Sequence, residues 1–171
     1  NEDGFYYQPR LDEELLDLLP AGDVWITTAC VAGWKYRSEE EDRLKALWKK
    51  LYDKHGDNFM FEVQYHPSER QKELNRYILE LRKEIPAPII MGCDSHYIDV
   101  NGAELRTDFL VSKEDRKAYD DEEDWFMDYP DGDTAVQRFR DQGVLNETEI
   151  ESAINQTNCF LEVEEYECDI F

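Results

Sequence analysis

Basic residues are scarce in this chain. It has 19 Lys and Arg against 41 Asp and Glu in 171 residues, which gives a formal net charge of −22. Non-specific affinity for nucleic acid comes from Lys and Arg that neutralise phosphates, so we do not expect this chain alone to bind DNA through an exposed face. A bound metal ion would still handle phosphate, because the cation supplies local positive charge.

Other absences narrow the class of protein further. No apolar run approaches the roughly 18 residues of a membrane span, and no signal peptide is visible. The cysteines form no C-x-x-C pair, so a structural zinc knuckle is not indicated. They are Cys30, Cys93, Cys159 and Cys168. A glycine-rich phosphate loop and a Ser-His-Asp arrangement are also missing. We expect a cytoplasmic chain with reduced thiols and no membrane contact.

What is present suits one folded domain over 1–171, because 41% of the residues are hydrophobic and 13% are aromatic. Apolar runs predict strands over 24–30, 58–66 and 87–93. Capping boxes at Ser38 and Ser68 open helices that separate these strands and end near Lys54 and Glu84. Residues 1–100 therefore read as two consecutive βαβ units, a βαβαβ sector of a parallel α/β sheet or barrel.

The second half, 101–171, reads as an acidic aromatic loop with C-terminal helices. We expect helices over 102–110, over 134–142 with a stop at Gly143, and from the cap Asn146 to about residue 158. The stretch 112–133 is acidic and rich in aromatic residues, which predicts a loop that packs aromatic anchors. The tail 159–171 resembles one more strand or extended segment.

The stretch "APIIMGCDSHYIDV" places Asp94 and His96 just after a buried strand. Side chains at i and i+2 of a strand point to the same face, so the two would converge on one point. Their donor types suit a divalent metal. The alternative is a solvated loop in which Asp94 merely orients His96.

Chemistry in α/β sheets and barrels gathers at the carboxyl ends of the strands. Strand 24–30 would place Cys30 there, and strand 58–66 would place Glu62, Gln64 and His66 on one face. Together with Asp94 and His96, a cysteine on this edge completes a ligand set that zinc, manganese or iron accepts. Each residue also has a structural interpretation: Cys30 as a small buried hydrophobe, Glu62 as a residue of the outer helix-facing layer or a partner of a lysine, and His66 as a hydrogen bonder at a strand end.

Four blocks in order carry a family resemblance. They are "DVWITTACVAGW", "GDNFMFEVQYHP", "LNRYILELRKEIPAPIIMGCDSHYI" and "AELRTDFLVSK", and "FYYQPRLDEELL" precedes them. The chain resembles, over about residues 5–160, the PHP (polymerase and histidinol phosphatase) domain of bacterial DNA polymerase III alpha subunits. Cys93 departs from the family pattern, in which asparagine is common at that position.

The resemblance implies a seven-stranded TIM-like barrel that holds up to three metals, with Cys30, Asp94 and His96 in ligand positions. The family's opening His-x-His motif is not found here, and the chain has only three histidines. We therefore expect the C-terminal part of a PHP domain, without the N-terminal part of the barrel, and an incomplete site for zinc or manganese.

Two functions follow from the resemblance. In the first, the complete domain is a metal-dependent phosphoesterase with 3′-5′ exonuclease proofreading activity, and the fragment alone is inactive. In the second, the domain is a metal-free scaffold that packs on the polymerase or its proofreading subunit. A free-standing acidic interaction module is a more distant reading. The expected partners are the remainder of the polymerase polypeptide, DNA only through that parent enzyme, and a second copy through an uncovered sheet edge.

Overall fold

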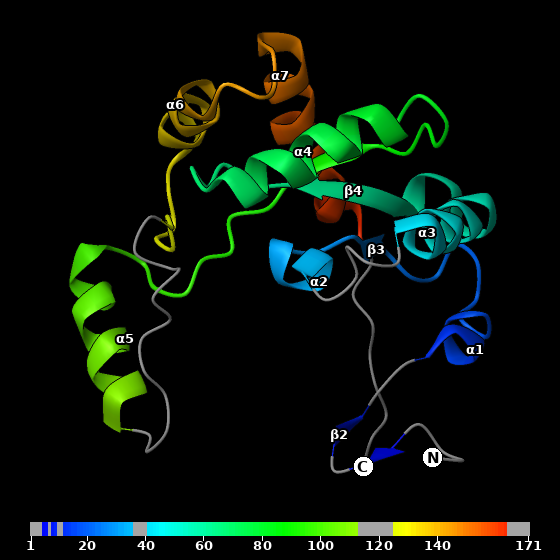
Figure 1. The fold of residues 1–171 in the computed structure, drawn as a ribbon, viewed down its shortest axis with the longest axis horizontal. Coiled ribbons are helices and arrows are strands. Elements are labelled where there is room, and N and C mark those ends of the chain that lie inside the picture. Colours follow the sequence, from blue (N-terminus) through cyan, green and yellow to red (C-terminus); the bar gives the residue numbers. More distant parts are fainter. Residues whose placement is uncertain (1–4, 7, 10–11, 36–40, 113–124, 164–171) are drawn as a thin grey trace.

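The computed structural model describes residues 5–6, 8–9, 12–35, 41–112 and 125–163 (Figure 1). The elements, in chain order, are β1 (Phe5–Tyr6), β2 (Gln8–Pro9), α1 (Glu13–Leu16), β3 (Ile26–Thr27), α2 (Val31–Lys35), α3 (Glu41–His55), η2 (Gly56–Asn58), β4 (Phe59–Val63), α4 (Glu69–Leu81), β5 (Ile89–Met91), α5 (Val100–Ser112), α6 (Gly132–Gln142), α7 (Glu147–Gln156) and η3 (Thr157–Glu162). The expected α/β class is confirmed.

Three parallel strands form the centre of the fold, in the order β3-β4-β5. Ile26 pairs with Phe59, and Phe61 pairs with Ile89. The three parallel strands expected within residues 24–93, and the expected helix before each of the last two, are therefore confirmed. Strand β3 is shorter than expected, because Ala29 lies in the left-handed region with φ 58°, which ends the extended backbone. In the described ranges the parallel sheet is open, so the TIM-like barrel is not shown.

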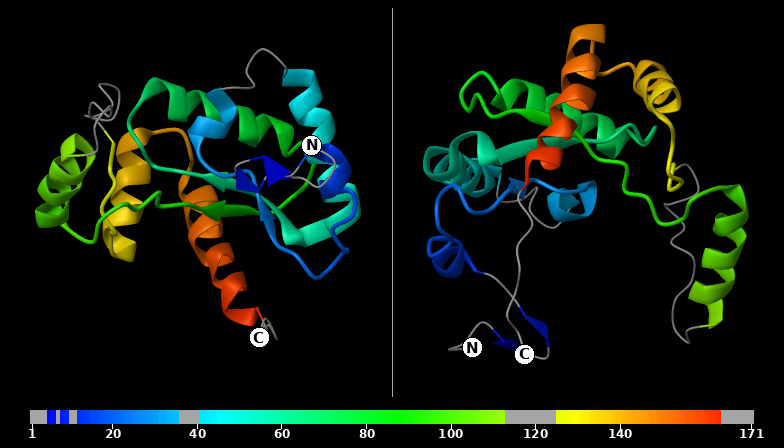
Figure 2. Two further views of the ribbon diagram at one scale, coloured as in Figure 1. Left: turned by 90° about the horizontal axis from the view of Figure 1, so that it is seen from below. Right: turned by 180° about the vertical axis from the view of Figure 1, so that it is seen from behind.

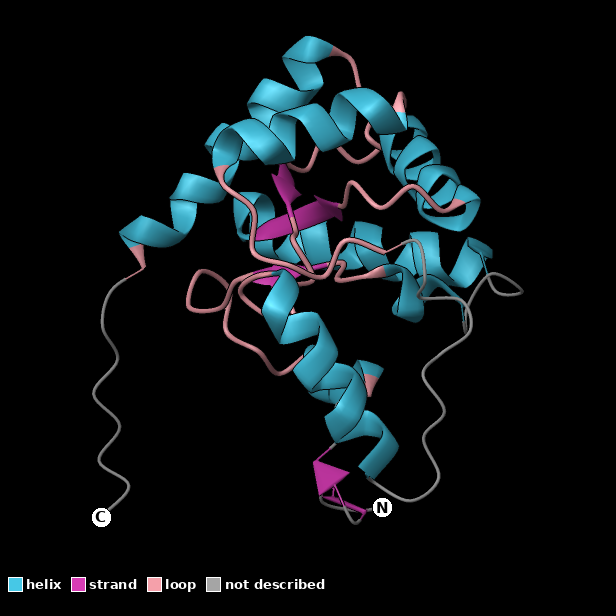
Figure 3. Cartoon of the chain, turned by 90° about the vertical axis from the view of Figure 1, so that its left-hand side faces the viewer, coloured by secondary structure: helices cyan, strands magenta, loops and turns pink. Residues whose placement is uncertain are grey.

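The core lies between one face of the sheet and the helices, and Figure 3 shows the strands enclosed among helices. Side chains of and just after β4 are fully buried on this face: Phe59, Phe61, Val63 and Tyr65. Trp48 of α3 packs edge-on against Phe61, with ring centroids 5.5 Å apart. Burial of such aromatic side chains supplies much of the apolar area that stabilises a chain of this size.

Local signals fix most helix ends. Ser68 Oγ accepts from the backbone N–H of Gln71 at 3.3 Å and starts α4. Asn146 forms a full capping box with Glu149 and starts α7. Gly143 adopts φ 71° and ends α6. The cap expected at Ser38 lies outside the described residues.

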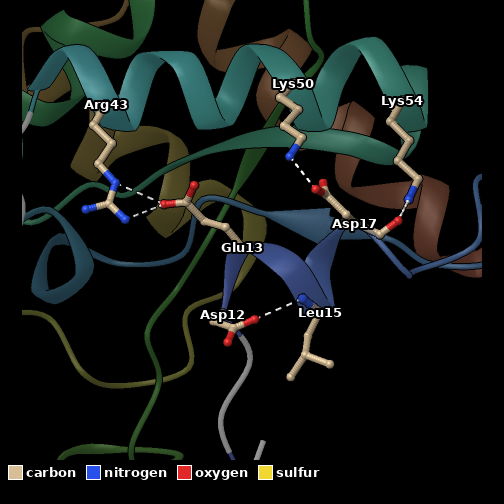
Figure 4. Close-up of polar contacts among 7 residues, drawn as sticks. All are labelled: Asp12, Glu13, Leu15, Asp17, Arg43, Lys50 and Lys54. Atoms are coloured by element: carbon tan, nitrogen blue, oxygen red, sulfur yellow. Dashed lines mark hydrogen bonds and ion pairs between the residues drawn. The ribbon is translucent and has the colours of Figure 1, made fainter. Parts of the chain in front are cut away.

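The short helix α1 docks on α3 through charged side chains (Figure 4). Arg43 pairs with Glu13, and Lys50 pairs with the carboxylate of Asp17. Lys54 donates to the backbone carbonyl of Asp17. These side chains are well exposed, so the pairs orient α1 and contribute little to stability.

Two segments differ from expectation. Residues Val31–Lys35 form helix α2, where the sequence pattern predicted neither a helix nor a strand. Thr157–Glu162 form a 3-10 helix, so the strand or extended segment expected at the start of the 159–171 tail is wrong, and residues 164–171 lie outside the described residues.

Helix α5 stands apart from the three strands in Figures 1 and 2. No helix in the described part of the chain is long and apolar enough to cross a membrane.

Candidate metal centre

The carboxyl ends of the three strands lead into one edge of the sheet, here called the rim: residues 28–30 after β3, 64–66 after β4 and 92–96 after β5. Ala29 and Asp94, with φ 58° and 49°, are the non-glycine residues with left-handed backbone in the described ranges. Left-handed backbone is costly for a residue with a Cβ, and such strain clusters at functional sites. Both strained positions lie at the rim, beside or at an expected ligand.

Asp94 and His96 are in contact through the backbone of Asp94. His96 Nδ1 lies 2.8 Å from the backbone carbonyl oxygen of Asp94. A carbonyl oxygen only accepts hydrogen bonds, so Nδ1 must carry the proton. The lone pair of neutral His96 then resides on Nε2, on an exposed ring. This is the form in which histidine ligates a metal while a backbone carbonyl orients it.

A segment far along the chain holds this turn in place. Residues 125–129, here called the clasp, run beside it. The backbone N–H groups of His96 and Tyr97 donate to the carbonyl of Met127 at 2.8 and 3.2 Å. Ser95 Oγ donates to the carbonyl of Asp128 at 2.9 Å. The position of Asp94 and His96 therefore depends on the clasp as well as on β5.

Arg138 of α6 anchors the clasp. Its guanidinium pairs with the Asp128 carboxylate at 2.7 Å and holds the pKa of that carboxyl below its usual range. The same guanidinium lies 4.2 Å from the centre of the Phe126 ring. The Arg138 side chain is only 15% exposed. Because water screens this ion pair less than the exposed pairs of α1, the pair holds the clasp in place.

His66 is fully buried at the end of β4. Its ring stacks on Trp125 with centroids 5.0 Å apart and planes inclined by 20°. Its Nδ1 accepts from the backbone N–H of Phe126 at 3.2 Å, and its Nε2 has no hydrogen-bond partner among the described residues. Burial lowers the pKa of His66 to about 4, although the Asp94 carboxylate opposes the shift. The ring is neutral at pH 7.

A buried amide network fixes the backbone beneath His66. Gln142 Nε2 donates to the carbonyls of Gln64 and His66 at 2.9 and 2.7 Å. Asn75 Nδ2 donates to the Gln64 carbonyl and to Gln142 Oε1, both at 2.8 Å. Gln71 Nε2 in turn donates to Asn75 Oδ1 at 3.0 Å. Our sequence analysis missed the network, because it joins positions far apart in the chain and each amide alone resembles an ordinary helix residue.

Glu62 sits on the other face of β4, and among the described residues no lysine pairs with it. Its carboxylate accepts from Thr27 Oγ1 of β3 at 3.0 Å and from Gln64 Nε2 at 2.8 Å. Gly92, at the end of β5, leaves room for it, since a Cβ there would lie 2.0 Å from Glu62 Oε1. Glu62 therefore links the ends of all three strands.

Gly92→Ala is expected to lower the free energy of unfolding by about 2 kcal/mol, because the displaced Glu62 carboxylate loses both hydrogen bonds. Urea denaturation measures the change. Gly33→Ala in α2 is the control: a Cβ at Gly33 meets no atom within 4 Å, and alanine favours a helix. In a chain that already carries Glu62→Ala, the added Gly92→Ala should change the free energy of unfolding little, because the carboxylate that the new Cβ would meet is gone. A full, additive loss in the double variant would contradict the steric account.

Cys30 follows β3 at the same rim. It lines an apolar pocket with Thr28, Gly33 and side chains of α3 that include Leu47 and Trp48. Within the described ranges, no three His, Cys, Asp or Glu side chains gather closely enough to hold a metal ion. The structure thus joins the His96 ring to the backbone carbonyl of Asp94, and among the described residues Cys30 forms no three-ligand cluster with them. The ligand roles of Cys30, Asp94 and His96 stay a prediction.

The donors at the rim fit part of a cation site. His96 presents an Nε2 lone pair, and Asp94 places a carboxylate two residues away on a strained turn. His66 does not fit as a further ligand through Nε2, because its Nδ1 accepts a hydrogen bond and the proton must reside on Nε2. Two protein ligands are fewer than zinc sites use, so further donors would be needed.

Comparison with known proteins points to one group. The chain is 35% identical to DNA polymerase III subunit alpha of Aquifex aeolicus over 101 aligned residues. The alignment covers 57% of this chain and 9% of the relative. It is 31% identical over 103 residues to the subunit alpha of Borreliella burgdorferi, covering 57% and 9%. With that of Thermus aquaticus it shares 26% identity over 126 residues, covering 72% and 10%. No protein-family model matches the chain.

The chain therefore resembles a segment of DNA polymerase III alpha subunits. It spans about a tenth of the length of these relatives. The similarity agrees with the polymerase resemblance that the sequence blocks suggested, and it does not by itself assign a PHP domain.

Proposed function

We propose that this chain is part of the PHP domain of a replicative DNA polymerase III alpha subunit and supports DNA replication there. In the complete domain, Asp94 and His96, with Cys30, would contribute to a divalent-metal site for 3′-5′ phosphodiester hydrolysis. The similarity to alpha subunits supports the polymerase assignment. The single observation that carries the site is the hydrogen bond from His96 Nδ1 to the Asp94 carbonyl, which leaves Nε2 free to bind.

In this proposal zinc or manganese would supply an activated water molecule and positive charge that clamps the phosphodiester. The residues of this chain would bind and orient. His96 holds its Nε2 lone pair outward, and Asp94 offers a carboxylate beside it. The clasp fixes both through Met127 and Asp128. The basic surface that holds DNA would come from other parts of the polymerase, since this chain carries a net charge of −22.

The 171-residue chain alone is expected to show no metal-dependent nuclease activity, because its rim offers too few ligands. The test uses the longer polymerase polypeptide on 3′-labelled single-stranded DNA with Mn²⁺ or Zn²⁺. Asp94→Asn should lower the rate of 3′-5′ degradation about a hundredfold, while Asp99→Asn, which removes the same charge five residues along, should leave it unchanged. Robust nuclease activity of the short chain, or no difference between the variants, would contradict the proposal.

A metal-free scaffold that packs on the polymerase or its proofreading subunit is the second candidate. It is favoured by the lack of a three-ligand cluster in the described part of the chain. In that case Asp94→Asn and His96→Gln would leave DNA degradation by the longer polypeptide unaffected, and their effect would be confined to stability.

A further inference from the structure

A groove with a volume of about 350 Å³ lies between α6 and α7, which are neighbours at the top of Figure 1. Its buried and half-buried lining residues, here called the floor, are apolar: Val136, Ile150 and Ile154. Exposed charged residues also line it: Arg140, Glu147 and Glu151. An apolar floor with a charged, exposed border is typical of a surface that binds another protein.

The two helices are held in a fixed relative position. Gly143, with φ 71°, turns the chain between them. Arg140 and Glu147 pair across this turn, with Nε–Oε1 and Nη2–Oε2 distances of 2.9 and 2.7 Å. At the far end of α7, Thr157 Oγ1 accepts from the backbone N–H of Met91 in β5 at 3.1 Å. A groove that is formed in advance loses less conformational entropy when a partner binds.

The charge at the groove favours a cationic partner. Arg140 and Glu147 neutralise each other. The carboxylate of Glu151 is exposed and has no ion pair within the described ranges. Helix α7 carries three glutamates and no lysine or arginine, and the whole chain has a net charge of −22. This charge repels a second copy of the chain and attracts a basic segment.

The spacing of the floor residues fits a helix as the partner. Ile150 and Ile154 lie one turn apart on α7, and Val136 lines the same groove from α6. An amphipathic helix presents its apolar side chains at the same spacing, i and i+3 or i+4, and commonly binds by laying that face into an apolar groove.

We propose that the groove between α6 and α7 binds a basic amphipathic helix of a protein partner. Two apolar side chains of that helix, one turn apart, cover the floor, and a lysine or arginine beside them pairs with Glu151. Neither Asp94 nor His96 lines the groove, so this docking site is independent of the proposed metal site.

Selection from a displayed library of helical peptides, with the 171-residue chain as bait, tests the partner's chemistry. All peptides share one alanine-rich scaffold, and the residues on one face vary. We expect the selected peptides to carry leucine, isoleucine or phenylalanine one turn apart, with lysine or arginine on the flank. Selected peptides with neutral or acidic flanks, or a library that yields no binder, would overturn the proposal.

Matched substitutions locate the binding site of a selected peptide, with its Kd measured by titration calorimetry. Glu151→Lys should weaken binding about fivefold. Glu14→Lys makes the same charge change on α1, away from α6 and α7 in Figures 1 and 2, and should leave the Kd nearly unchanged. Equal weakening by both would mean that the peptide senses only the overall negative charge, which would overturn the docking site.

A second pair tests the floor. Val136→Phe places a larger side chain in the groove and should weaken binding about tenfold. Gln137→Phe, at the next position of α6, is exposed and does not line the groove, so it should have little effect. Urea denaturation shows whether each variant is folded, and if Val136→Phe is not, the pair of glutamate variants decides. Equal effects of the two phenylalanines in folded chains would overturn the proposal.

Discussion

Replacing Gln142 by alanine is expected to lower the free energy of unfolding by about 3 kcal/mol. The side chain is 6% exposed and donates to the carbonyls of Gln64 and His66. Its removal leaves the His66 carbonyl without this donor in a buried position and takes an acceptor from Asn75. Each buried polar group that loses its partner stays removed from water without a hydrogen bond to compensate. The expected loss of stability therefore exceeds that of one ordinary hydrogen bond.

Gln137→Ala supplies the matched control. It lies on the same helix and is exposed, and among the described residues its amide donates to Asp141 one turn along. Its loss should change stability by less than about 0.5 kcal/mol. Urea denaturation of the three chains measures the difference. Similar losses for the two glutamines would show that the network does not stabilise the rim.

Acidification is expected to destabilise the chain through His66, by about 3 kcal/mol between pH 6.5 and pH 4. Burial lowers the pKa of the folded ring to about 4 from an ordinary value of 6.5. In this window the unfolded chain binds a proton that the folded chain excludes, so stability falls as pH falls. The contribution is fully present above pH 6.5 and is lost toward pH 4.

His66→Gln isolates this effect, because it removes the titrating ring and leaves the other charges of the chain unchanged. Unfolding free energies of both chains at intervals from pH 7 to pH 4 give the comparison. Wild type should lose about 3 kcal/mol more than the variant across the window. Parallel curves would mean that His66 is solvated or already charged in the folded chain.

Local signals predicted the helices and strands well where they were strong. The asparagine at 146, the glycine at 143 and the serine at 68 each mark a helix end that the structure confirms. Local sequence signals were weaker where tertiary packing decides the secondary structure. Val31–Lys35 is helical although no local signal predicted a helix there, and Thr157–Glu162 forms a 3-10 helix although its apolar residues suggested a strand or extended segment.

The candidate site was predictable in part. The i, i+2 spacing predicted that the side chains of Asp94 and His96 share one face of a strand. In the structure β5 ends at Met91 and Asp94 has left-handed backbone, and the contact is between the His96 ring and the backbone carbonyl of Asp94. The clasp and the amide network were not predictable, because Asn75 and Gln142 are 67 residues apart and no local pattern couples them. The tautomers of His66 and His96 could not be predicted from the sequence either, since each depends on which backbone group faces Nδ1.

The central claim is that Asp94 and His96 are two donors for one cation. Zn²⁺ affinity at His96, followed by nuclear magnetic resonance in the 171-residue chain, tests it most directly. Asp94→Asn and Asp99→Asn each remove one negative charge close to His96 and keep the side-chain shape. We predict that Asp94→Asn weakens Zn²⁺ binding about tenfold or more while Asp99→Asn leaves it unchanged. Equal effects of the two substitutions, or no effect of either, would contradict the account.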